Sequence, residues 1–130
     1  MNLDNAVLAW IEYGDHDMLT ANQMAVTIPP PLEIVAFHYQ QAAEKYLKAG
    51  LAAFSLPIPK THDLLSLNRQ LAPCFPKIAE LEMDCDRLTD FGTVTRYPNE
   101  SVVLDEGKIT LAEDASGRIC DLLRNWLFTK

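Results

Sequence analysis

Amphipathic helical repeats, separated by proline clusters, constrain the fold of this chain more than any other feature of the sequence. In residues 4–26, apolar side chains recur at alternating steps of three and four positions, which is the spacing of one face of an α-helix. Residues 32–54 carry two such stripes, and a helix that is apolar over most of its circumference lies in the centre of a bundle. The sequence therefore predicts two long helices, separated by the prolines at 29–31, because proline cannot donate the backbone hydrogen bond of a helix interior.

Three further helices are expected after the second. Thr61 is the expected N-cap of a helix over residues 62–71, with Asp63 in its first turn, where the helix dipole favours a negative charge. The remaining expected segments are helices at 77–94 and 108–128, a turn at 96–99 and a loop at 101–107. Because no strand-length alternation stands out, the predicted fold is all-α, an antiparallel up-and-down bundle of four to five helices in a single domain over residues 1–130.

Charge and cysteine content limit the partners and the compartment. The 130 residues carry a formal net charge of -7 at pH 7, which opposes non-specific binding to nucleic-acid phosphates but leaves room for a local basic site. Cys74, Cys85 and Cys120 form no CxxC pair, so we expect buried free thiols rather than disulfides or zinc. A signal-like leader and an apolar run long enough for a bilayer are both missing, so the sequence predicts a cytoplasmic protein without a membrane segment.

The second helix carries a polar line among its apolar stripes. This line comprises His38, Gln41 and Lys45, with Glu44 and Lys48 beside it at i,i+4 spacing. In one interpretation the line binds a phosphate or a base, since lysine supplies a point charge while histidine and glutamine supply directional hydrogen bonds. In the other, Glu44 and Lys48 form a solvated pair while His38 and Gln41 join neighbouring helices.

Three other places in the sequence carry candidate residues. The start of the third helix is a potential anion site, and capping explains Thr61 and Asp63 but not His62. Arg96 and Tyr97 follow a helix end, where they either complete a turn or hold a nucleotide, with the guanidinium on a phosphate and the ring on a base. The run Asp15-His16-Asp17 points in three directions on a helix, so we expect an exposed cluster, no metal site and no cofactor.

Three motifs together resemble the HEPN family (higher eukaryotes and prokaryotes nucleotide-binding domains). They are FHYQQAAEKYLKA at residues 37–49, KTHDL at 60–64 and LTDFGTVTRYP at 88–98. The resemblance implies a helical bundle that pairs into a homodimer and acts with a minimal nucleotidyltransferase, in some cases as a toxin–antitoxin pair. From the candidate residues described above, we predict that the nucleotide-binding residues are His38, Gln41, Lys45, Lys48, His62, Asp63, Arg96 and Tyr97.

The ribonuclease branch of this family carries an arginine followed four to six residues later by histidine. None of His16, His38 and His62 has an arginine at that interval, and no histidine follows Arg96. The principal hypothesis is therefore a non-enzymatic nucleotide-binding and interaction module with a nucleotide or RNA ligand. The alternative is an RNA-cleaving toxin with a non-standard site, in which Arg96 and either His38 or His62 converge.

Overall fold

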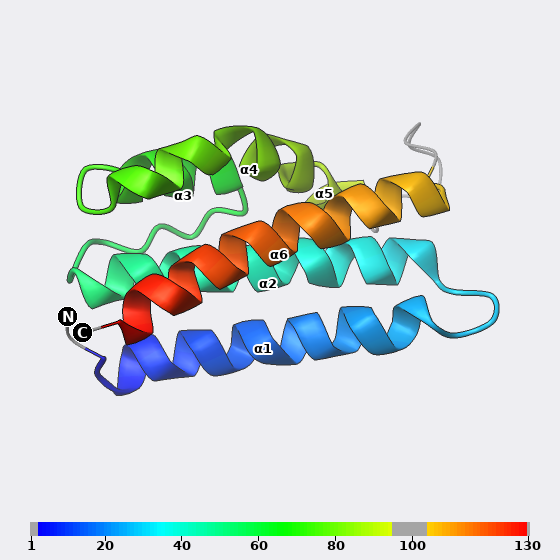
Figure 1. Cartoon of the computed structure of the whole chain (residues 1–130), viewed down its shortest axis with the longest axis horizontal. Helices are drawn as coiled ribbons and strands as arrows, with labels where there is room; N and C mark the ends of the chain where they lie inside the picture. Colours follow the sequence, from blue (N-terminus) through cyan, green and yellow to red (C-terminus); the bar gives the residue numbers. More distant parts are fainter. Residues whose placement is uncertain (1–2, 95–103, 130) are drawn as a thin grey trace.

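Two long antiparallel helices, α1 (Asn5–Ala25) and α2 (Leu32–Ala53), form the framework on which the other helices pack. The computed structural model describes residues 3–94 and 104–129, and every regular element in them is helical. The elements that follow α2 are α3 (Leu64–Leu71), the 3-10 helix η1 (Pro76–Leu81), α4 (Glu82–Thr89), α5 (Phe91–Val94) and α6 (Glu106–Phe128). Figure 1 shows α2 in the middle, with α1 on one side, the α3–α5 arm on the other and α6 crossing in front. The predicted all-α bundle is confirmed.

A glycine allows α1 to approach α2 closely. A Cβ atom on Gly14 would lie 2.8 Å from Cδ2 of Tyr46 and 3.4 Å from the carbonyl oxygen of Ala42. The ring of Tyr46 therefore occupies the space that a side chain at position 14 would need. This contact explains why a glycine, which lowers the stability of a helix interior, occurs on the buried face of α1.

The arm between α2 and α6 is broken into short helices, so the single helix predicted for residues 77–94 is wrong. Pro76 starts η1, and the side-chain amide of Asn68 donates to the carbonyl of Ile78 at 2.7 Å. Thr89 ends α4 and its hydroxyl donates to the Cys85 carbonyl at 2.9 Å. The same hydroxyl accepts from the backbone N–H of Leu64 at 3.1 Å. These side chains take up backbone groups that a continuous helix would use, which favours breaks over regular geometry.

Aspartates cap α1, α3 and α6 at their N-termini. Asp4 accepts from the N–H of Val7 at 3.0 Å, as the sequence suggests. The third helix is capped by Asp63 rather than Thr61, whose hydroxyl accepts from the N–H of Asp63 at 3.1 Å. Asp105 caps α6, so this helix begins at Glu106, within the loop predicted over residues 101–107.

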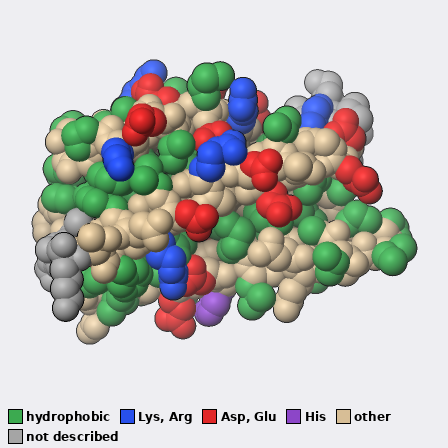
Figure 2. All heavy atoms as spheres, in the orientation of Figure 1, with side chains coloured by type: hydrophobic (Ala, Val, Ile, Leu, Met, Phe, Trp, Pro, Cys, Tyr) green, Lys and Arg blue, Asp and Glu red, His purple; other side chains and the backbone are tan. Residues whose placement is uncertain are grey.

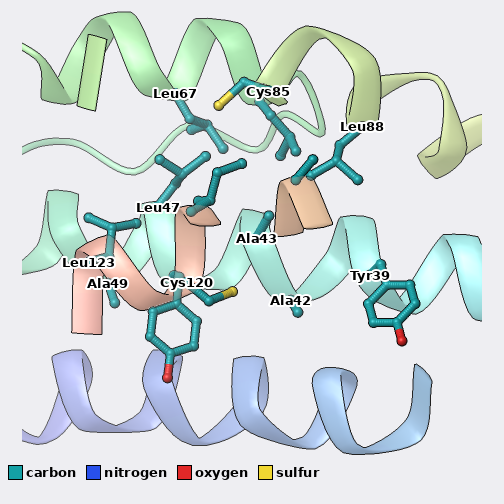
Figure 3. Packing of buried hydrophobic residues seen from close by; sticks show 14 of the residues in the cluster. Tyr39, Ala42, Ala43, Leu47, Ala49, Leu67, Cys85, Leu88, Cys120 and Leu123 are labelled. Carbon is teal, nitrogen blue, oxygen red and sulfur yellow. The ribbon is translucent and has the colours of Figure 1, made fainter. Parts of the chain in front are cut away.

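The core lies between α2 and the α3–α4 arm and continues beneath α6. In Figure 3, Leu47 of α2 faces Leu67 of α3, with Leu88 and Cys85 of α4 beside them, and the Tyr39 ring extends toward α1. All five side chains are fully buried. Among the helices that the structure describes, none is both long enough and apolar enough to traverse a bilayer.

The three cysteines are free thiols, but only two of them are buried. Cys85 and Cys120 lie in the core, as expected, whereas Cys74 is exposed. Cys74 follows the end of α3, where its backbone N–H donates to the carbonyl of Leu71 at 2.9 Å. The prediction of burial is therefore wrong for Cys74, because its turn lies at the surface of the arm.

Candidate functional site

Asp17 of α1 is a nearly buried carboxylate that gathers two cationic side chains of α2. Its side chain is 10% exposed, and Oδ1 lies 2.8 Å from Nδ1 of His38. The ammonium group of Lys45 donates to Oδ2 of the same carboxylate. His38 and Lys45 are seven positions apart, which places them on one face of α2, so a single carboxylate on α1 reaches both.

Glu44 forms a second carboxylate centre four residues before Lys48 on α2. Its Oε2 accepts from Nζ of Lys48 at 3.1 Å, and its Oε1 lies 2.8 Å from Nδ1 of His62 in the segment before α3. The side chains of Glu44 and Lys48 are 4% and 8% exposed, whereas that of His62 is 57% exposed. Lys48 also lies 5.7 Å from the ring centroid of Trp10, within range of a cation–π interaction. This pair is buried, so of the two interpretations of the polar line, the part that makes Glu44 and Lys48 a solvated pair is wrong.

A backbone anchor holds His62 in this position. The side-chain amide of Gln40 donates to the carbonyl of His62 at 3.1 Å, and Gln40 is completely buried. A Cβ atom on Gly92 of α5 would lie 3.1 Å from the Gln40 amide. Close packing from α5 therefore fixes Gln40, which in turn fixes the histidine backbone against α2.

The two centres balance most of their own charge. Each carboxylate is paired with one lysine, and each also holds one imidazole through Nδ1. Within residues 3–94 and 104–129, Nε2 of neither His38 nor His62 has a hydrogen-bond partner, so these atoms can meet a ligand. An anion that approaches must compete with Asp17 and Glu44 for the lysines, because a paired cation attracts a second anion less strongly.

The structure places four of the eight predicted site residues around these carboxylates. They are His38, Lys45, Lys48 and His62. Gln41 lies between them on α2 and is partly exposed. Asp63 instead accepts from the N–H groups of Leu65 and Ser66, at 3.1 and 3.4 Å, and caps α3. Arg96 and Tyr97 lie outside the described residues.

Neither of the two carboxylates that organise the site is among the residues predicted to form it. Asp17 was expected in an exposed cluster, but His16 is exposed while Asp17 is buried. The sequence pattern does indicate the burial of Asp17, since this residue falls between Gly14 and Ala21 on the buried stripe of α1. An acidic residue on an apolar stripe predicts a buried partner, because burial of an unpaired charge is costly.

A further polar cluster joins α1, α2 and α6 on the other side of the α1–α2 pair. The hydroxyl of Tyr46 bonds to Asp15 at 2.5 Å and accepts from the guanidinium of Arg124, which also donates to both Asp15 oxygens. Burial, followed by the bond to Asp15, raises the pKa of Tyr46 above its ordinary value. Tyr46 therefore stays neutral and ties the three helices together. Among the described residues, no group of His, Cys, Asp and Glu side chains has a metal-binding arrangement.

The fold and the site together place this chain among the all-helical bundle proteins, with a face of histidine and lysine side chains on the central helix. The family model for the HEPN domain matches residues 7–126, nearly the whole chain. The chain therefore belongs to the HEPN domain family, as its motifs suggest.

A solved structure shares this fold. The chain is similar to TT1696 from Thermus thermophilus, with a TM-score of 0.83 and 21% sequence identity. The match covers 94% of this chain and 98% of TT1696. No curated protein matches the chain.

Proposed function

We propose that this chain is a HEPN-type nucleotide-binding and interaction module that acts with a minimal nucleotidyltransferase, as its substrate-binding subunit or in a toxin–antitoxin pair. Membership in the HEPN family supports this assignment. The single observation that carries it is the gathering of His38, Lys45, Lys48 and His62 around two nearly buried carboxylates, one on α1 and one on α2. The proposal includes a homodimer, located in the cytoplasm.

The side chains of the site divide into those that a ligand reaches and those that support them. The side chains of His62, His38 and Lys45 are 57%, 26% and 23% exposed, whereas that of Lys48 is 8% exposed. In this proposal His38, Gln41, Lys45 and His62 contact the nucleotide. Lys48 holds Glu44, and Asp63 holds the start of α3. Arg96 is proposed to bind a phosphate and Tyr97 to stack on the base, as the sequence suggests.

Calorimetric titration with ATP, AMP and a short single-stranded RNA tests this proposal. Lys45→Gln and His62→Gln are expected to weaken binding at least about tenfold, which corresponds to the loss of roughly one charge-assisted hydrogen bond. Arg96→Ala is expected to have a similar effect. Lys77→Gln is the matched control, since it removes one exposed positive charge on η1, away from the site. Absence of heat with all three ligands would overturn nucleotide binding and leave a protein-binding adaptor.

One observation favours a second function, the cleavage of RNA. Asp17–His38 and Glu44–His62 are both carboxylate–imidazole pairs, the arrangement in which a carboxylate orients a histidine for proton transfer. Incubation with labelled RNA, together with growth of cells that express the chain, separates this function from binding. Cleavage and growth arrest that disappear in His38→Gln, His62→Gln or Arg96→Ala would establish the enzyme. Intact RNA with the wild type would remove this alternative.

A further inference from the structure

Three adjoining hollows lie in a row between α1 and α6, with α2 beneath them, and we call this row the α1–α6 groove. Its central part has a volume of about 420 Å³ and is bordered by Met18 and Asn22 of α1 and by Gly117 of α6. It continues past Asp121 to the cluster around Tyr46, and in the other direction past Glu113 to the N-terminus of α6. In the described part of the chain, no helix covers this groove (Figure 1).

The groove is long enough to hold a docked helix of several turns. On α6 it is bordered by residues spaced three or four apart, from Glu106 to Arg124, which is about 27 Å at 1.5 Å per residue. Phe128 continues this stripe and is 49% exposed. Across the groove, Leu8 and Leu19 lie beside Asp15 on the α1 helix surface and are 43% and 55% exposed. Exposed apolar side chains therefore accompany the groove at its rims.

The lining of the groove is acidic. Its charged residues are Asp15, Glu106, Glu113, Asp114, Asp121, Arg118 and Arg124. Arg118 donates to both oxygens of Asp84, at 2.8 and 2.9 Å, and Arg124 donates to both oxygens of Asp15. Carboxylates therefore neutralise both arginines, and the surface keeps an excess of negative charge. Figure 2 shows several Asp and Glu side chains over the middle of this face of the molecule, where α6 runs.

Gly117 leaves the middle of the groove open. Apart from its chain neighbours and the nearby backbone of α6 itself, no atom lies within 4 Å of the position that its Cβ would occupy. Packing within this chain therefore does not require glycine there, although glycine inside a helix costs about 0.5–1 kcal/mol relative to alanine. A residue without a side chain at this point allows the backbone of a docked helix to come close.

We propose that the α1–α6 groove docks a basic, amphipathic α-helix of a partner protein. Lysine or arginine side chains of that helix pair with Asp114 and Asp121, and its apolar side chains cover Met18 and Phe128. Nucleic acid is disfavoured because the lining repels phosphates. A second copy of this chain, docked groove to groove, is disfavoured because like charges would face each other across a twofold axis.

This inference does not rest on the proposed nucleotide site. Asp15, Met18 and Asn22 follow the groove side of α1, while Asp17 and Trp10 turn to the opposite side, toward His38 and Lys48. A variant in one surface leaves the other intact, so the two proposals are separately testable.

Fluorescence anisotropy with synthetic peptides tests the docking. The probe is a labelled Lys/Leu amphipathic peptide of about 20 residues, long enough to span the groove as a helix. Its charge-reversed Glu/Leu twin tests charge, and a version with two central prolines tests the need for a helix. The chain of 130 residues is expected to bind the basic helical peptide and to bind neither comparison peptide.

Two variants locate the binding. Asp114→Lys combined with Asp121→Lys is expected to weaken binding at least about tenfold. Gly117→Leu is expected to do the same by filling the groove, and its fold is preserved because the added side chain has open space. Glu80→Lys combined with Asp86→Lys, at exposed positions on η1 and α4, makes the same charge change and is expected to alter binding less than about twofold.

Several results would overturn the proposal. Equal weakening by the control pair would mean that only net charge attracts the peptide. If Gly117→Leu bound the basic peptide as tightly as the wild type, the groove would not be the binding site. If the proline peptide bound equally well, the ligand would not bind as a helix. Dissociation of a wild-type dimer by Gly117→Leu, seen by light scattering, would assign the groove to contacts between copies of the chain.

Discussion

Asp17 and Glu44 determine what the polar face of α2 can do. Each holds a lysine and a histidine in a fixed position, although acidic side chains on their own repel the phosphates that the face is proposed to bind. Their role is to fix the two Nδ1 atoms, which leaves Nε2 of each imidazole to meet a ligand. The carboxylates therefore weaken the attraction between the lysines and a phosphate, but they fix the position of each imidazole.

Glu44→Gln is expected to destabilise the fold by about 3–5 kcal/mol. The substitution leaves the ammonium group of Lys48 nearly buried without a counter-charge, which is the costly way to break a buried ion pair. Urea unfolding monitored by circular dichroism measures the change. The double variant Glu44→Gln with Lys48→Met is expected to recover most of the loss, because no charge then remains buried.

The pair between Arg69 and Glu82 provides the control for this measurement. Their side chains are 66% and 37% exposed, so Glu82→Gln is expected to cost less than about 1 kcal/mol. A similar loss for Glu44→Gln and Glu82→Gln would show that the Glu44–Lys48 pair is solvated after all.

At the scale of the helices, two glycines in comparable helical positions have opposite roles. Gly14 lets α1 lie against the Tyr46 ring, which Asp15 and Arg124 hold in place, whereas Gly117 has open space around it. Replacing each glycine with alanine therefore distinguishes two contributions to stability: the close packing between helices and the intrinsic helix propensity of alanine.

Gly14→Ala is expected to destabilise the protein by about 1–3 kcal/mol, because the new methyl group overlaps a ring that cannot move away easily. Gly117→Ala is expected to stabilise it by about 0.5–1 kcal/mol, since only the helix propensity changes. Thermal unfolding of the two variants measures both effects. Equal changes of the same sign would contradict the close approach of α1 and α2 at Gly14.

At the scale of the whole molecule, buried thiol and phenol groups with raised pKa values make the stability of the fold fall at alkaline pH. Burial raises the pKa of Cys85 to about 11 and those of Cys120 and Tyr39 to about 12, and Glu113 adds to the effect at Tyr39. The folded state therefore keeps protons that the unfolded chain releases at ordinary values near 9 and 10. The stability is fully present below about pH 9 and is lost as the pH rises toward 12.

Urea midpoints measured from pH 8 to 11 are expected to fall, most steeply above about pH 9. The double variant Cys85→Ala with Cys120→Ala is expected to flatten the first part of this fall, because both buried thiols are removed. A midpoint that stays constant, or one that rises with pH, would contradict burial of these groups.

The proposed homodimer is also tested at this scale. Light scattering with size exclusion at micromolar concentration is expected to give about twice the chain mass of 14.6 kDa. The exposed aromatic side chain of Tyr13 on α1 is suited to an interface of this kind. A monomer across this concentration range would overturn the dimer.

Much of the bundle could be predicted because helix periodicity is a local property. The expected ranges 4–26 and 32–54 agree with α1 (Asn5–Ala25) and α2 (Leu32–Ala53), since each stripe repeats over several turns between prolines. The arm after α3 could not be predicted in this way. Its breaks depend on Asn68 and Thr89, whose side chains bond to backbone groups of other segments.

The sequence alone determined the helical class, the two long helices, the family and the shared face of His38 and Lys45, because all of these follow from spacing along one chain segment. The tertiary structure decided which acid each base meets, since Asp17 and Lys45 are 28 positions apart and only the packing of α1 on α2 joins them. It likewise created the α1–α6 groove, because α2 holds these two helices side by side while their backbones stay apart and side chains such as Arg124 and Asp15 bridge them. Local periodicity sets which face of a helix is polar, whereas the position of one helix on another sets what that face contacts.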